Sequence, residues 1–287
     1  MEFNRRKALA SAFFALAAGR ARAAPPFEAQ GGQYTSFDGA QLFYRRMGQG
    51  PPVVLLHGFL SDGPRMWFNT GIAQTIAAAG FSVIAPDARA HGLSAAPAGP
   101  YPKDVLTMDV EALVRLLKLR SYRLFGYAMG ARTAVRMMAR GARPERCVLG
   151  GTGAAGALDV DRVVRPNIET VRSGRSARDP RLGVLVQSAI RLQKLKPAAL
   201  IAVLSSQIST PRAELAPIRT PILILNGEKD AQEGSPTELA ALFPSAAVAH
   251  TAGDHVSALR EARFGQLAAA FLKSDDPPAR FAAAAAL

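Results

Sequence analysis

The segment from Gly126 to Gly130 has the spacing of a turn that carries a nucleophile, but the nucleophile is missing. In the pattern G-x-S-x-G, a serine stands on a tight strand-to-helix turn with its hydroxyl exposed above a sheet. Both glycines are present here, after a strand-like run (residues 122–125) and before a helix-like run (residues 131–140). Ala128 occupies the serine position, and its methyl group cannot attack a carbonyl carbon. The pattern therefore predicts the turn and leaves its chemistry open.

A candidate acid and a candidate base follow this turn later in the chain. Asp230 comes shortly after a strand-like run (residues 221–225), and His255 comes shortly after the next one (residues 246–249). In the order nucleophile, acid, histidine, the carboxylate accepts a hydrogen bond from one imidazole nitrogen and leaves the other facing the nucleophile. The segment ending Gly227-Glu228-Lys229-Asp230 resembles the Gly-x-x-Asp acid loop of the α/β-hydrolase family, and Gly253-Asp254-His255 resembles its Gly-x-His base loop. This resemblance implies that Asp230 and His255 form the pair. Asp254 is the weaker candidate for the acid, since adjacent residues rarely direct their side chains at each other.

Two backbone N–H groups are candidates for an oxyanion hole. His57-Gly58-Phe59 follows a buried strand-like run, and a glycine turn there can direct the N–H of Phe59 into a cleft. The second donor is the N–H of Met129, at the start of the helix that follows the turn. In well-studied enzymes each such donor stabilises the developing oxyanion by about 3–4 kcal/mol.

The residues around the turn predict an apolar binding pocket. Leu60, Trp67 and Tyr127 are the candidate substrate-binding residues, beside the two oxyanion donors. Trp67 suits packing in the core equally well.

Strand-like and helix-like segments that can position these residues alternate along most of the chain. Asp38-Gly39 joins the first two strands as a hairpin turn. Alternating strands and helices predict an α/β fold, with a mostly parallel central sheet flanked by helices. The predicted strands are residues 33–37, 41–46, 52–56, 81–85, 122–125, 147–150, 221–225 and 246–249. The predicted helices are residues 67–79, 104–119, 131–140, 236–242 and 256–272.

The alternation stops between residues 151 and 219, where the composition suggests helices and loops. We predict that residues 151–219 are a helical cap (lid) inserted in one core, which residues 24–150 and 220–273 form together. The alanine-rich residues 274–287 predict a flexible tail. Within the insertion, the predicted helices are residues 160–171, 182–195 and 197–204.

The first 23 residues have the pattern of a signal peptide. Arg5-Arg6-Lys7 precedes a short apolar run, and Ala21-Arg22-Ala23 supplies a small-x-small cleavage site. The apolar run is too short for a stable membrane span, so no span is expected in the mature protein. We therefore predict export, to the periplasm or outside the cell. The paired arginines make the twin-arginine route one candidate.

Composition argues against several other classes of protein. The formal net charge of +13 comes from scattered basic residues without interleaved aromatics, which predicts a solvated surface and no nucleic-acid partner. The single Cys147 lies in an apolar run and predicts a buried thiol. The four histidines lack the spacing of metal ligands, and no phosphate-binding glycine loop follows a strand. We expect neither a metal nor a cofactor.

The order of these motifs resembles the α/β-hydrolase family, in its single-domain form with a cap, over about residues 33–273. The segment from Asp87 to Ser94 resembles the family's loop D-x-R-G-x-G-x-S. Ala90 replaces a usual glycine, so we expect the turn to avoid a left-handed backbone there. His91 and Ser94 are expected to be structural.

The resemblance implies a cofactor-free, esterase-like hydrolase of small, mostly apolar ester-like or related carbonyl substrates, using Ser-Asp-His chemistry. Leu60 where epoxide hydrolases often have proline, and the absence of an aspartate at position 128, argue against epoxide hydrolases and dehalogenases.

Three interpretations of Ala128 are open. The alanine is a substitution introduced to trap a substrate, or the chain is a non-catalytic binder of small molecules. In the third, His255 and Asp230 act as a general base on water or on an acidic substrate proton. All three predict that the present chain is inactive, or very weak, as a serine hydrolase.

Overall fold

The computed structural model describes residues 29–176 and 180–286. The predicted signal peptide (residues 1–23) lies outside them and stays a prediction. Among the described residues, no helix combines the length and the apolar character that crossing a membrane requires.

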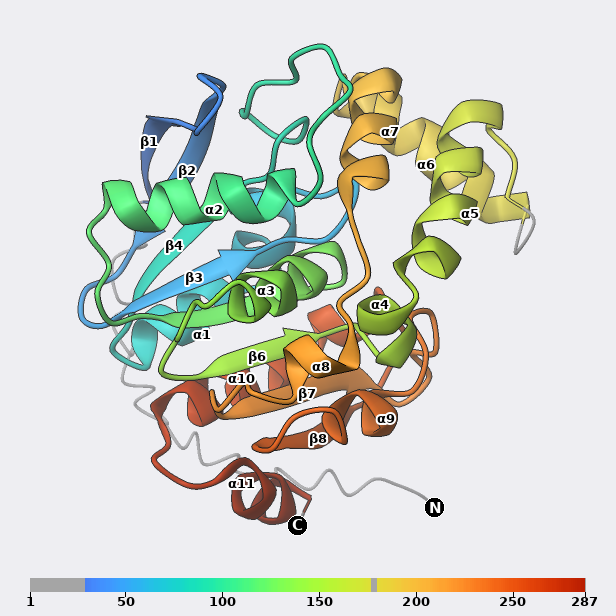
Figure 1. Cartoon of the computed structure of the whole chain (residues 1–287). Coiled ribbons are helices and arrows are strands. Elements are labelled where there is room, and N and C mark those ends of the chain that lie inside the picture. The colour runs from blue at the N-terminus through green and yellow to red at the C-terminus, as the bar shows by residue number, and fades with distance from the viewer. Residues whose placement is uncertain (1–28, 177–179, 287) are drawn as a thin grey trace, which may run out of the picture.

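An eight-stranded sheet with the order β1-β2-β4-β3-β5-β6-β7-β8 forms the centre of the molecule. The pairs β1/β2 and β2/β4 are antiparallel, and all the other neighbours are parallel (Figure 1). Each predicted strand has a counterpart whose ends lie within three residues, and the predicted fold class is confirmed. The strands are β1 (Gln30–Thr35), β2 (Gln41–Met47), β3 (Pro52–Leu56), β4 (Ser82–Asp87), β5 (Arg123–Tyr127), β6 (Cys147–Gly150), β7 (Ile222–Gly227) and β8 (Ala246–Thr251).

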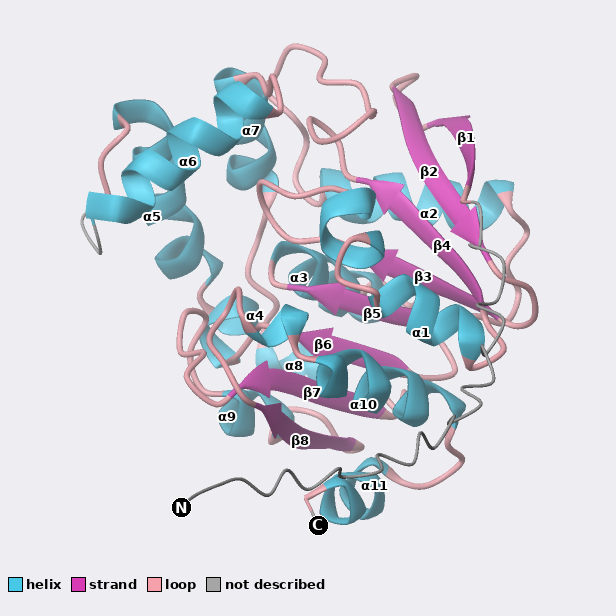
Figure 2. Ribbon diagram, turned by 180° about the vertical axis from the view of Figure 1, so that it is seen from behind, coloured by secondary structure: helices cyan, strands magenta, loops and turns pink. Residues whose placement is uncertain are grey.

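Helices cover both faces of the sheet. Helices α1 (Ile72–Ala78) and α10 (Ala262–Lys273) lie on one face, and α2 (Val105–Leu116) and α3 (Met129–Ala139) on the other (Figure 1, Figure 2). The central strands are buried on both faces, which explains why they are continuous apolar runs rather than alternating ones. Because β3 to β8 run parallel, their carboxyl ends share one edge of the sheet, where the predicted site residues meet.

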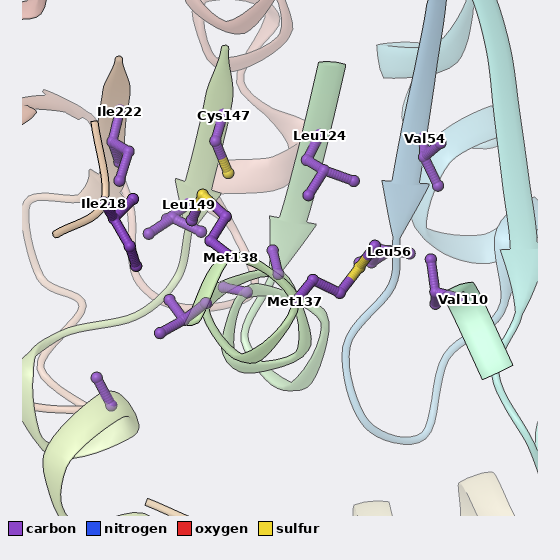
Figure 3. Close-up of a cluster of buried hydrophobic side chains, with 14 of the residues drawn as sticks. Val54, Leu56, Val110, Leu124, Met137, Met138, Cys147, Leu149, Ile218 and Ile222 are labelled. Atoms are coloured by element: carbon purple, nitrogen blue, oxygen red, sulfur yellow. The ribbon is translucent and has the colours of Figure 1, made fainter. Parts of the chain in front are cut away.

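The core between α3 and the sheet contains the chain's single cysteine. Met137 and Met138 of α3 project onto the sheet, where Leu124, Cys147 and Leu149 lie (Figure 3). Cys147 is fully buried, and this burial raises the pKa of its thiol. The thiol is therefore a packing group.

Among the described residues between β6 and β7, in the region predicted as a cap, there are five helices. Helices α5, α6 and α7 stand beyond the carboxyl ends of the central strands, to one side of the sheet (Figure 1, Figure 2). The helices are α4 (Ala154–Leu158), α5 (Val160–Ser173), α6 (Pro180–Leu192), α7 (Pro197–Ser206) and α8 (Arg212–Leu215).

Two predicted helices are interrupted. The first is a π-helical turn (Pro64–Phe68) followed by α1, because Gly71 has φ +81° and breaks the helical path. The second is a short 3₁₀ turn (Ala258–Arg260) followed by α10, with the extended residue Glu261 between them. Helix α9 (Pro236–Ala240) agrees with its prediction except that it ends two residues early.

The prediction of a flexible tail at residues 274–287 is wrong for most of this segment. Residues Pro278–Ala285 form helix α11, which lies against β8. Phe281 packs its ring 5.2 Å from that of Phe271 in α10. Alanine favours a helix once one aromatic side chain anchors it, and that anchor belongs to the tertiary structure.

Candidate active site

Ala128 sits on a strained turn between β5 and α3. Its backbone angles are φ +49° and ψ −112°, which a residue with a side chain rarely adopts and which costs about 1–3 kcal/mol. The N–H of Ala128 donates to the carbonyl of Gly150 at 2.9 Å and fixes the turn. The chain therefore retains the nucleophile geometry at a position that has no nucleophilic atom.

The flanking glycines are required by the close approach of other backbone segments. A Cβ on Gly126 would lie 2.3 Å from the carbonyl oxygen of Gly130. A Cβ on Gly130 would lie 1.9 Å from the carbonyl oxygen of Leu56, at the end of β3. The G-x-A-x-G spacing therefore packs the turn against the neighbouring strand.

His255 and Asp230 form a hydrogen-bonded pair at the ends of β8 and β7. The distance from His255 Nδ1 to Asp230 Oδ2 is 2.9 Å, and the aspartate side chain is only 2% exposed. Within the described part of the chain, His255 Nε2 has no hydrogen-bond partner, and His255 lines the same cavity as Ala128. A neutral imidazole in this arrangement can accept a proton at Nε2 while the carboxylate stabilises the cation.

Asp254 has a different task in the same loop. Its carboxylate accepts hydrogen bonds from the N–H groups of Val256 and Ser257 and from the Ser257 hydroxyl. These bonds lower the pKa of Asp254 to about 2. The carboxylate therefore fixes the turn that presents His255.

The loop from His57 to Leu60 runs beside Ala128. A Cβ on Gly58 would lie 3.5 Å from the Cβ of Ala128. Among the described residues, neither the Phe59 N–H nor the Met129 N–H donates to a protein acceptor, and both residues line the cavity. Both N–H groups are therefore free of protein acceptors in residues 29–176 and 180–286, and their role as oxyanion donors stays a prediction.

Two buried histidines hold this loop. His57 Nδ1 donates to the Gly58 carbonyl at 2.8 Å. Because the peptide between Gly58 and Phe59 is trans, the Phe59 N–H then points to the opposite side. His91 Nε2 accepts from the Leu60 N–H at 3.3 Å. Burial lowers the pKa of both imidazoles, that of His91 to about 3. Both rings are therefore neutral near pH 7 and keep an acceptor nitrogen.

The cavity at the turn has a volume of about 410 Å³ and is mostly apolar. Apolar residues of α6, including Leu182, Leu185 and Val186, form one wall. At its polar end the buried side chains of Arg132 and Glu233 form an ion pair. Sequence reasoning missed this pair. The spacing in the sequence could have indicated it, because Arg132 follows Ala128 by one helical turn and Glu233 follows Asp230 by three residues.

Of the predicted pocket residues, Leu60 lines the cavity and Trp67 does not. Trp67 has 0% exposure, and its ring lies 4.9 Å from that of Phe125. The π-helical turn directs the indole into the core beneath the sheet, so its assignment to the pocket is wrong. Packing in the core, the other interpretation, agrees with this position.

Tyr127 contributes to the cavity wall, but its hydroxyl is directed elsewhere. The hydroxyl donates to the backbone carbonyl of His255 at 2.7 Å. The ring fills a slot over Gly150 and Gly151, where a Cβ would approach it to 2.7 Å and 2.5 Å. Tyr127 therefore ties the strand before Ala128 to the loop of the candidate base.

The Tyr127→Phe substitution is expected to lower the free energy of unfolding by about 1 kcal/mol, because it removes the donor to the part-buried His255 carbonyl. Urea denaturation measures the change. The matched control is Tyr122→Phe, since no hydrogen bond of the Tyr122 hydroxyl is recorded among the described residues. Equal losses in the two variants would show that the Tyr127 hydroxyl bond is not what stabilises this loop.

The expectation that the loop at Ala90 avoids a left-handed backbone is wrong. Ala90 has φ +65°, is 3% exposed, and donates its N–H to the Ala95 carbonyl. Asp87 fixes the loop by accepting from the N–H groups of Gly63 and Leu93. The surrounding hydrogen bonds therefore impose the conformation that glycine would adopt more easily.

The Ala90→Gly substitution is expected to change the free energy of unfolding by less than about 1 kcal/mol. Relief of about 1–2 kcal/mol of left-handed strain offsets the lost methyl burial and the greater chain entropy of glycine. Ala134→Gly, in the buried interior of α3, removes the same methyl without relief and should cost about 2 kcal/mol. Thermal unfolding of both variants checks this difference, and equal costs would contradict it.

A family model described as the alpha/beta hydrolase fold matches residues 51–148. The AB hydrolase superfamily protein YisY of Bacillus subtilis is 28% identical over 215 residues, which cover 66% of this chain and 78% of that protein. The chain belongs to the α/β-hydrolase fold family.

Individual relatives of this α/β hydrolase differ in their named activities. The non-heme chloroperoxidase CPO-A1 of Kitasatospora aureofaciens is 34% identical over 106 residues, but these cover only 37% of this chain and 38% of that protein. A solved hydrolase of Pseudomonas aeruginosa PA01 has a TM-score of 0.71 at 23% identity, covering 85% of this chain and 98% of that one. Other matches are named as esterases and epoxide hydrolases.

Proposed function

We propose that this α/β hydrolase binds a small, mostly apolar ester or related carbonyl compound at Ala128, and that its serine-type hydrolysis is inactive or very weak. One observation carries the proposal: the His255–Asp230 pair lies beside a strained turn on which Ala128 presents a methyl group in place of a nucleophile. In the bound state, the carbonyl oxygen accepts from the Phe59 and Met129 N–H groups. Helices α5 to α7 act as a cap that gives the cavity its apolar wall.

The missing hydroxyl closes the acyl-enzyme route. In serine hydrolysis the hydroxyl oxygen attacks the carbonyl carbon while the histidine takes its proton. In subtilisin, loss of the serine reduces turnover by about 10⁶, and about 10³–10⁴ over water survives from the oxyanion hole and binding. We expect residual rates of that order here.

General-base catalysis is the second candidate function. It is favoured by the unpartnered Nε2 of His255, which can take a proton from a water molecule or from an acidic substrate carbon. The attacking hydroxide or the carbanion then places negative charge on the carbonyl oxygen, next to the two N–H donors. This route needs His255 and Asp230 but no serine.

Turnover of a panel of short-chain p-nitrophenyl esters by the unmodified chain and by His255→Ala separates the two candidates. Base catalysis predicts that the substitution lowers kcat about 10²-fold or more. Equal rates in the two proteins would contradict general-base catalysis by His255 and leave binding as the proposed function.

Binding is tested by calorimetric titration with the same esters. The matched variant is Ala189→Phe, which narrows the cavity from α6 without touching the His255–Asp230 pair. We expect weaker binding by this variant. Absence of binding by the unmodified chain would overturn the proposal.

A further inference from the structure

Exposed apolar side chains lie on α6, and two exposed apolar residues also border the cavity. Val184, Leu185 and Leu192 of α6 are 65%, 65% and 81% exposed, and Val256, beside the candidate base, is 61% exposed. Leu185 and Val256 also line the cavity, so these side chains border its opening. The other large exposed apolar residues, among those described, are distributed elsewhere: Phe37, Leu93 and Leu116.

The exposed residues of α6 form a face of their own. The exposed positions 181, 184, 185, 191 and 192 recur at helical spacing on the outer side. The opposite side buries Val186 and Ile190 in the cluster with residues of α5 and α7. The inner side of α6 therefore accounts for its packing. Of the outer apolar residues, Leu185 borders the cavity, whereas Val184 and Leu192 neither line the cavity nor belong to a hydrophobic cluster of the described residues.

Exposed basic residues lie on α6, just after it and at the cavity. Arg191, Lys194 and Lys196 are exposed on and just after α6, and the exposed Arg260 lies at the cavity. Between residues 174 and 206, the sequence has a single acidic residue, Asp179. The basic residues there are Arg175, Arg178, Arg181, Arg191, Lys194 and Lys196.

We propose that the outer face of α6, together with Val256, docks on an anionic lipid bilayer. A helix that exposes leucine and valine between basic side chains binds at a membrane interface. Its apolar groups enter the acyl boundary, and its cations lie at the anionic headgroups. The mouth of the cavity then faces the bilayer, so an apolar compound dissolved in the lipid can enter without crossing water.

Charge selects the bilayer over a second copy of this chain. In a two-fold symmetric dimer through this face, the same basic residues would meet each other, and their repulsion opposes association. An anionic bilayer offers the opposite charge and an apolar interior at once. The docking is independent of whether the site hydrolyses anything.

Cosedimentation of the protein with large vesicles tests the proposal. We expect binding to phosphatidylcholine vesicles that contain phosphatidylglycerol to be at least about tenfold tighter than binding to phosphatidylcholine alone. Raising NaCl from about 50 to about 500 mM shortens the screening length and should weaken this binding. Absence of binding, or equal affinity for the two vesicles, would overturn the proposal.

Matched substitutions locate the contact. The double variant Val184→Asp/Leu192→Asp changes two exposed residues that do not line the cavity and should bind anionic vesicles at least about tenfold more weakly. The control Leu93→Asp/Leu116→Asp adds the same charge at exposed residues elsewhere and should bind like the unmodified chain. Equal losses would show that binding follows net charge and does not use α6.

A variant that preserves the charge separates the contribution of the apolar side chains from that of electrostatic attraction. Val184→Ser/Leu192→Ser removes the apolar groups, leaves every charge in place, and should still lose affinity. Full affinity in this variant would contradict insertion of the apolar face.

Discussion

The Ala128→Ser variant is expected to hydrolyse short-chain p-nitrophenyl esters at least about 10³-fold faster than the unmodified chain. The substitution adds one oxygen to a Cβ that already stands on the required turn, with φ +49° and ψ −112°. His255 lines the same cavity, and its free Nε2 can take the proton of the new hydroxyl. The upper limit is about the 10⁶ that loss of the serine costs in subtilisin.

Two further variants test whether a gain in ester hydrolysis comes from the new serine acting with His255. Ala128→Ser combined with His255→Ala should return to the unmodified rate, because the hydroxyl then lacks its base. Ala128→Gly controls for relief of the strained turn and should gain no activity. A silent Ala128→Ser variant that still binds ester would mean that the turn, base and oxyanion donors do not act together.

The second large effect is expected from Asp230→Asn in the Ala128→Ser background. Loss of the carboxylate that accepts from His255 Nδ1 at 2.9 Å should lower kcat by about 10⁴, as in the corresponding change of a serine protease. The amide favours the wrong tautomer and cannot stabilise the imidazolium. KM should change little, because Asp230 does not line the cavity. Steady-state kinetics on one ester measures both constants.

Asp254→Asn is the matched control, since it changes the neighbouring carboxylate by the same single group. Asp254 accepts from N–H groups of its own loop, and its replacement should lower kcat only severalfold. A larger loss of kcat for Asp254→Asn than for Asp230→Asn would show that Asp254, and not Asp230, is the acid.

Much of the fold follows from local patterns in the sequence. Continuous apolar runs predicted the strands of the parallel sheet, because strands buried on both faces have no polar side. The glycines at 126 and 130 predicted the turn, since backbone contacts at 2.3 Å and 1.9 Å leave no room for a Cβ. The apolar runs and the glycine spacing can be read from the sequence alone, but the contact of Gly130 with Leu56 is made only in the fold.

Side-chain direction was less predictable. Trp67 follows Leu60 of the candidate oxyanion loop by seven residues in the sequence, but the π-helical turn directs its side chain into the core. Tyr127 precedes Ala128, yet its hydroxyl contacts a carbonyl 128 residues away. Ala90 adopts a left-handed backbone because hydrogen bonds from other segments hold its loop.

The sequence by itself determined the order of strands and helices, the strained turn with alanine in place of serine, and the residues that could serve as acid, base and oxyanion donors. The tertiary structure decided which of these meet: the pairing of Asp230 with His255, the Arg132–Glu233 pair in the cavity, and the exposed apolar face of α6. The physical reason is range. Hydrophobic periodicity and the residue types of a turn can be read within a short stretch of sequence, whereas a cavity is formed by side chains from segments that only folding brings together.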